Sequence, residues 1–131
     1  MNNIPIAVGI DSVITSRFES WKTLPDKNLS KFFSSEEIAY ARLNKLFFSQ
    51  RLAVRFAAKE AFLKALQQIY PKKKLHLLTI AQAVEIKKSY QGMPFLKINW
   101  EKIIEKEAFQ TTLSLTHETC HATAVVIIYK P

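Results

Sequence analysis

Cysteine and glycine are scarce in this chain, and each scarcity excludes a class of protein. Among its 131 residues, one is cysteine and two are glycine. Cys120 cannot form an internal disulfide, and no CxxC or Cys/His pattern predicts a zinc site, which excludes disulfide-rich and zinc-stabilised domains. Because glycine occurs only at Gly9 and Gly92, without any Gly/Ser linker, we expect regular structure to dominate.

Long uncharged apolar runs are also missing. None approaches the roughly 20 residues that span a bilayer, so no membrane segment is expected. The N-terminus lacks the basic region of a signal peptide. The chain has no repeats, yet 48% of it is hydrophobic and nine phenylalanines supply core material. We therefore expect a single cytoplasmic domain over residues 1–131.

Acidic residues are outnumbered by basic ones. Nineteen Lys and Arg against eleven Asp and Glu give a net charge of +8. Such a surplus favours a polyanionic partner, whether nucleic acid, an acidic protein, a membrane surface or a phosphorylated ligand. Charge alone does not choose among these partners, and a merely basic surface explains it too. The dispersed lysines and the lack of a nucleic-acid-binding motif count against nucleic acid.

The first half of the chain predicts one strand and then helices. Residues 5–10 are typical of a buried strand, after which Asp11 and Ser12 offer a cap for a short helix through Trp21. Polar and acidic residues at 34–37 indicate a helix that runs to about Leu43. The longest helix is expected from about Phe48 to Tyr70, with apolar residues on several sides.

The last third of the chain changes to the period of a β-strand. Apolar and polar residues alternate at 83–87 and 95–100, and again at 112–116 and 121–129, which predicts two hairpins. The order of strand, helices and strands predicts an α+β domain in which an antiparallel sheet packs against the long central helix.

The stretch at residues 55–66, RFAAKEAFLKAL, carries the clearest chemical signal. Glu60 and Lys64 are four residues apart and so share one helical face. Small residues on the same face are expected to leave room for a ligand; they are Ser49, Ala53 and Ala57.

A second carboxylate, Asp11, ends the apolar run of residues 6–10. Together with Glu60 it could hold a hard divalent cation, while Lys64 balances a phosphate. Taken singly, Asp11 would also suit a helix cap, and Glu60 with Lys64 would suit a surface ion pair.

Three pieces of sequence, in this order, resemble the holo-acyl-carrier-protein synthase family, the small phosphopantetheinyl transferases. They are Val8-Gly9-Ile10-Asp11 followed by Arg17, residues 55–61 with Lys64, and Ser114-Leu115-Thr116-His117 before residues 122–127. The turn Gly92-Met93-Pro94 also matches, and the resemblance spans nearly the whole chain.

The resemblance implies an enzyme that transfers the phosphopantetheine group of coenzyme A to a serine of apo acyl carrier protein. Adenosine 3',5'-bisphosphate is the implied by-product, and fatty-acid synthesis is one implied pathway. In this family Mg²⁺ is bound at the positions of Asp11 and Glu60, and the position of Lys64 contacts the pyrophosphate.

The same resemblance implies further contacts and an assembly. Arg55, His117 and the turn from Gly92 to Pro94 match positions near the adenosine end of coenzyme A and its phosphates. Arg17 matches the position at which the family meets the acidic carrier protein. A homotrimer with sites between subunits is the implied state.

The chain departs from the family pattern after Leu66, where residues 67–70 replace a glycine-rich turn with Gln-Gln-Ile-Tyr. The departure is expected to change the local phosphate contacts, the helix length and the catalytic efficiency. One alternative to the full transferase is therefore a weakly active family member with altered carrier choice. A non-catalytic basic module that binds nucleic acid or another polyanion is the second. The acceptor of the serine proton also stays open among Glu60, a water on the metal and His117, of which His117 better suits ligand contact.

Overall fold

A three-stranded antiparallel sheet forms one layer of the computed structural model, which describes residues 6–104 and 109–131. Its strands are β1 (Ile6–Ile14), β5 (His121–Tyr129) and β4 (Gln110–His117), in that spatial order. β4 and β5 form the second predicted hairpin, which is confirmed. The sheet is buried on one side only, since the side chains of Ala122 and Ala124 are inaccessible while those of Val8 and Ile10 are half exposed.

β1 is longer than predicted, and the helix that was expected to start at Asp11 is wrong. Residues 11–14 continue the pairing with β5, from Asp11 opposite Ala124 to Ile14 opposite His121. The following segment, Thr15–Thr23, is a 3-10 helix, η1, whose start has no side-chain cap. Asp11 is therefore an inward-facing residue within a strand, because the sheet pairing extends past the end of the apolar run.

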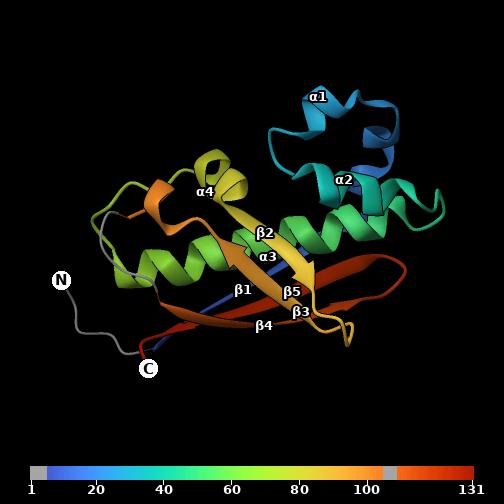
Figure 1. Cartoon of the computed structure of the whole chain (residues 1–131). Coiled ribbons are helices and arrows are strands. Elements are labelled where there is room, and N and C mark those ends of the chain that lie inside the picture. The colour runs from blue at the N-terminus through green and yellow to red at the C-terminus, as the bar shows by residue number, and fades with distance from the viewer. Residues whose placement is uncertain (1–5, 105–108) are drawn as a thin grey trace.

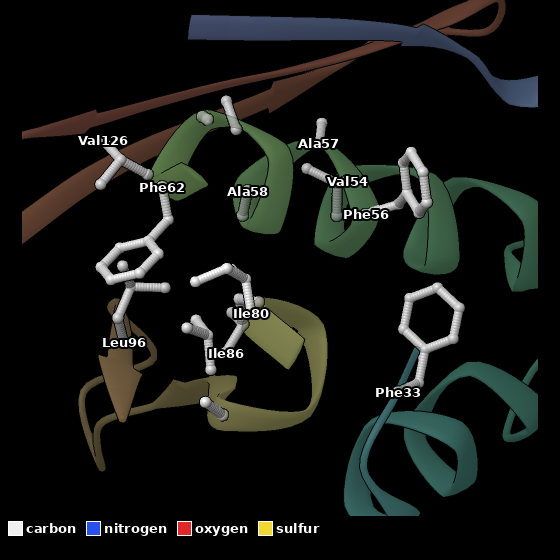
Figure 2. Close-up of a cluster of buried hydrophobic side chains, with 14 of the residues drawn as sticks. Phe33, Val54, Phe56, Ala57, Ala58, Phe62, Ile80, Ile86, Leu96 and Val126 are labelled. Carbon is white, nitrogen blue, oxygen red and sulfur yellow. The ribbon is translucent and has the colours of Figure 1, made fainter. Parts of the chain in front are cut away.

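The long helix α3 (Phe48–Ile69) lies at the centre of the molecule, as predicted (Figure 1). The three-stranded sheet covers one side of it, and the first predicted hairpin, β2 (Val84–Lys88) with β3 (Pro94–Ile98), covers the other. Figure 2 shows Val126 of β5 on the sheet side of α3 and Ile86 of β2 on the opposite side. A helix buried on both sides needs apolar residues all round, and this one has them.

The smaller helices are only partly those expected. α2 (Ser35–Arg42) begins with a capping box, in which Ser34 accepts from the Glu37 amide and the Glu37 carboxylate accepts from the Ser34 amide. Three short helices were not predicted; they are α1 (Asp26–Leu29), α4 (Leu77–Ala83) and η2 (Trp100–Lys102). Between the two hairpins the sequence is polar at residues 101–110, and part of this stretch lies outside the described residues. Within the described ranges, no helix has the length and apolar character to cross a membrane.

A buried ion pair between Lys59 and Glu37 connects the long helix α3 with the elements on its hairpin side. Lys59 of α3, whose side chain is 1% exposed, donates to Glu37 Oε1 at 2.8 Å, to the Phe32 carbonyl at 2.6 Å and to the Ala81 carbonyl at 2.9 Å. Glu37 in turn accepts from the Ile86 amide at 3.0 Å. Burial is the main cause that lowers the pKa of Lys59, and Glu37 opposes that shift. The network ties α3 to α2, α4 and β2.

Candidate active site

Asp11, Glu60 and Lys64 come together where β1 crosses α3. The Lys64 ammonium donates to Asp11 Oδ1 at 3.1 Å and to the Ile10 carbonyl at 3.1 Å. The predicted convergence of the three residues is therefore present. The alternative of an ion pair between Glu60 and Lys64 is wrong, because Lys64 reaches across to the strand and pairs with Asp11 instead.

Glu60 has no hydrogen bond or ion pair within the described residues. Partial burial raises the pKa of its carboxyl, and the negative charge of Asp11 raises it further. The charges of Lys64 and Arg17 act in the opposite direction. The site thus holds two carboxylates that repel each other, which favours a cation between them.

A stripe of small residues on α3 allows β1 to approach this closely. A Cβ atom on Gly9 would lie 1.9 Å from the Ala61 carbonyl oxygen and 2.8 Å from the Ala65 amide nitrogen. Only glycine fits at this position, two residues before Asp11. The close approach of strand and helix therefore sets the distance between Asp11 and the side chains of α3.

The same stripe corrects one expectation. The small residues Ser49, Ala53 and Ala57 were expected to leave room for a ligand, but they are 4%, 0% and 0% exposed. Ala53 and Ala57 belong to the hydrophobic core, and the Ser49 hydroxyl donates to Glu19 Oε1 at 2.6 Å. Their small size serves close packing, and the ligand space lies elsewhere.

The donor set suits a divalent cation that keeps several other ligands. Asp11 Oδ2 is buried and has no hydrogen-bond partner, although a buried carboxylate oxygen is normally satisfied. No group of three or more metal-binding side chains occurs among residues 6–104 and 109–131. Two carboxylates match Mg²⁺, which commonly takes one or two of them and completes its shell with substrate phosphates and water.

Two glutamines occupy the place of the glycine-rich turn that the family resemblance led us to look for. Helix α3 continues through both of them to Ile69. The Gln68 side chain accepts from the Val8 amide at 3.3 Å, and the Gln67 amide donates to the carbonyls of Tyr70 and Lys73 at 2.7 and 2.8 Å. Lys64 and Gln68 thus satisfy backbone groups on the free edge of β1, which an edge strand requires.

A separate cavity of about 380 Å³ lies between α3, the β2–β3 hairpin and β4. Three of the predicted coenzyme residues line it, namely Arg55, Pro94 and His117. Gly92 is not in its wall but supports the adjoining turn, where its φ of 82° is one that glycine adopts readily. Arg55 is 6% exposed and its Nε is buried without a partner, as expected of a donor that awaits an anion.

Sequence reasoning missed three further residues of this cavity. Tyr40 lies at its wall beneath three cations, with Arg51 and Arg55 at 4.1 and 4.6 Å from the ring centroid and Lys88 at 4.7 Å. Lys88 also donates to the Tyr40 hydroxyl at 2.9 Å, which is the main cause that lowers the pKa of Tyr40. No local motif could have found them, because they come from α2, α3 and β2.

Arg17 lies beside the carboxylate site, on η1. Its guanidinium is 4.9 Å from the Phe56 ring, one helical turn before Glu60. η1 is hydrogen-bonded to the β4–β5 turn. The Thr15 amide donates to the Cys120 carbonyl at 2.9 Å, and the Thr15 hydroxyl donates to the Thr119 carbonyl at 3.0 Å. A partner that contacts Arg17 would thus lie next to Glu60.

Comparison with known proteins assigns the family. The profile of the 4'-phosphopantetheinyl transferase superfamily matches residues 7–126. The chain belongs to this superfamily. A holo-[acyl-carrier-protein] synthase of Treponema denticola is 40% identical over 127 residues, which cover 94% of this chain and 97% of the relative. A synthase of the same name from Trichlorobacter lovleyi is 36% identical and covers 96% and 98% of the two chains.

Solved structures of the family agree with the fold. The complex of an acyl carrier protein synthase with coenzyme A from Chronobacterium ammoniagenes has a TM-score of 0.80 at 26% identity, covering 96% of this chain and 98% of that one. The Helicobacter pylori holo-[acyl-carrier-protein] synthase, also in complex with coenzyme A, has a TM-score of 0.70 at 30% identity, with 92% and 98% covered. The predicted family, fold class and enzyme class are therefore confirmed.

Proposed function

We propose that this enzyme transfers the 4'-phosphopantetheine group of coenzyme A to a serine hydroxyl of apo acyl carrier protein and releases adenosine 3',5'-bisphosphate. The observation that supports this proposal most strongly is the pair of neighbouring carboxylates, Asp11 and Glu60. One oxygen of Asp11 is buried and has no hydrogen-bond partner. The family match favours this reaction over the alternative of a non-catalytic polyanion-binding module.

In this proposal Asp11 and Glu60 hold Mg²⁺. The bound ion would supply positive charge against the pyrophosphate of coenzyme A, the charge stabilisation on which phosphoryl-type transfer mainly depends. Lys64 lies at the same site and supplies a further positive charge toward the pyrophosphate.

The proton of the carrier serine needs an acceptor. The serine oxygen forms a bond to the phosphorus that carries the pantetheine arm, and the bond from that phosphorus to the bridging oxygen breaks, leaving the electron pair on adenosine 3',5'-bisphosphate. Glu60 is the acceptor we propose, because its carboxylate lies at this site beside Asp11 and makes no hydrogen bond within the described residues. His117 lines the cavity with Arg55, which supports a ligand contact for this histidine.

The cation-lined cavity is the proposed site for the adenosine end of coenzyme A. Arg55 and His117 would contact phosphate oxygens, while Pro94 and the adjoining turn at Gly92 would border the base. A planar guanidinium held by a helix and an aromatic ring suits phosphate geometry, and Arg55 is held in both ways, by its bond to the Arg51 carbonyl and by the Tyr40 ring.

The carrier protein is the proposed macromolecular partner. Its acidic surface would meet Arg17, and the net charge of +8 would speed the encounter through electrostatic steering. We place this reaction in the cytoplasm, with a carrier of fatty-acid synthesis as one substrate.

A homotrimer with sites between subunits is the proposed assembly. The outer face of β1 exposes a row of large apolar side chains; these are Ile6, Val8, Ile10 and Ile14, each at least half exposed. A row of this kind on a sheet face is typical of a protein interface. Light scattering should report about three times the 15.1 kDa mass of the chain.

The test of the proposed reaction is the intact mass of purified apo acyl carrier protein after incubation with the enzyme, coenzyme A and Mg²⁺. We expect the mass to rise by one phosphopantetheine group, and the rise to disappear with EDTA. Glu101→Gln, which neutralises an exposed acid of η2, is a matched control that should transfer normally. A folded enzyme that modifies none of several carriers would contradict the proposal.

A further inference from the structure

The ammonium of Lys64 is bonded to one oxygen of Asp11, a carboxylate that the proposed metal site requires. Lys64 Nζ is 3.1 Å from Asp11 Oδ1, and it is anchored a second time by the Ile10 carbonyl at the same distance. Glu60, one turn earlier on the same helix, does not compete for this ammonium. Lys64 therefore forms its ion pair with the strand carboxylate, and its charge acts on Glu60 only through space.

This contact opposes the binding of a cation. A divalent ion on Asp11 would lie close to the positive charge of Lys64, and the two would repel each other. Asp11 is 15% exposed, so the repulsion is only partly screened by water. The Lys64 side chain is 53% exposed. It can therefore rotate into solvent, away from Asp11, once another acceptor is present.

We propose that Lys64 restrains cation binding in the free enzyme and lifts this restraint when the phosphates of coenzyme A arrive. The inference rests on the proposed function, because it takes coenzyme A as the source of those phosphates. The phosphate oxygens offer the ammonium a new acceptor, and both oxygens of Asp11 are then available to the cation. Metal and coenzyme A should consequently bind with positive cooperativity, and by linkage each should tighten the other equally.

Manganese titrations followed by electron paramagnetic resonance test this directly. Mn²⁺ is added to wild type, Lys64→Met and the matched control Lys102→Met, each with and without coenzyme A. Lys102 is an exposed lysine of η2, so its replacement changes the net charge equally but leaves the site intact. Without coenzyme A, we expect Lys64→Met to bind Mn²⁺ about fivefold more tightly than wild type or the control. Coenzyme A should then tighten Mn²⁺ binding less in Lys64→Met than in wild type.

The outcomes separate this inference from the proposed function. If wild type and Lys64→Met bound Mn²⁺ equally without coenzyme A, while the wild type still modified the carrier, the restraint would be overturned and the transfer reaction would stand. No Mn²⁺ binding by wild type in either condition would overturn the metal site and the restraint with it. Lys64→Gln, with its thermal unfolding measured beside Lys64→Met, shows whether either effect comes from a change in fold.

Discussion

Two lysines of α3, five residues apart, each pair with a carboxylate from another element, yet they lie in opposite surroundings. Lys59 and its partner Glu37 are both 1% exposed, and Lys59 donates three hydrogen bonds to fixed acceptors. Lys64 is 53% exposed and shares its ammonium between Asp11 and one carbonyl. One oxygen of Asp11 remains without a partner, whereas both oxygens of Glu37 are bonded.

The difference separates a structural ion pair from one that a ligand can replace. Every group around Lys59 is satisfied within the chain, so its removal leaves buried polar atoms without partners. The site around Lys64 is unsatisfied as it stands, with a free carboxylate oxygen and a repelled Glu60. One helix thus joins the layers of the fold through one lysine and serves the proposed chemistry through the other.

The largest effect on stability is expected at the buried lysine. Lys59→Met should lower the free energy of unfolding by about 4 kcal/mol, because Glu37 would be left charged in the core. Lys64→Met should lower it by less than about 1 kcal/mol, as is usual for exposed pairs. Urea unfolding of both variants measures the comparison. Equal losses would show that burial does not distinguish the two lysines.

The second largest effect is expected at Gly9. Gly9→Ala places a methyl group against the backbone of Ala61 and should lower stability by about 3 kcal/mol. It should also slow transfer, because Asp11 would move with the strand. Gly92→Ala is the matched glycine: nothing lies within 4 Å of its added Cβ, so only the strain of its positive φ remains, about 1 kcal/mol. Equal losses for the two variants would contradict the close approach of β1 and α3.

A smaller effect is expected for coenzyme A binding. Arg55→Lys keeps the charge but loses the planar fork, and should weaken coenzyme A affinity about tenfold in calorimetric titration. Arg42→Lys, at an arginine that pairs with Asp26 outside the cavity, is the control and should bind as wild type does. Should the two variants bind alike, the cavity would not be the coenzyme site.

The smallest effect concerns pH and Glu60. The pKa of Glu60 in the folded protein is raised above its ordinary value of 4.5, so folding favours the protonated carboxyl. The resulting stabilisation is fully present at a pH below 4.5 and is lost as the pH rises through the folded-state pKa. Glu60→Gln should therefore be more stable than wild type at pH 7 by less than about 1 kcal/mol. The gain should vanish at acidic pH. Thermal unfolding in EDTA across pH measures it, and a gain that persists in acid would refute this origin.

Much of the site was predictable because its signals are local or belong to the family pattern. The spacing of Glu60 and Lys64 and the sequence ending in Asp11 identified the three residues that the structure brings together. The partner of Lys64 was not predictable, because a four-residue spacing favours Glu60 and only the crossing of β1 over α3 supplies Asp11. Lys59 and Glu37 are 22 residues apart and carry no shared local signal.

The fold shows the same division. The polar and acidic residues at 34–37 predicted the start of one helix, and the helix expected to run to Tyr70 gave the end of another; the structure confirms both ends within about one residue. α4 was missed because its seven residues, Leu77–Ala83, are too few for helical periodicity to show and lack a side-chain cap. The end of β1 was misplaced because its pairing partner lies at the other end of the chain.

The most direct test of the central claim is to measure transfer rate and unfolding together for Asp11→Asn. This variant keeps the shape of the side chain and removes the charge that we propose to hold the metal. We predict a transfer rate at least about a hundredfold lower, with a free energy of unfolding within about 1 kcal/mol of wild type. A folded Asp11→Asn enzyme that modifies the carrier at the wild-type rate would contradict the assignment of the site.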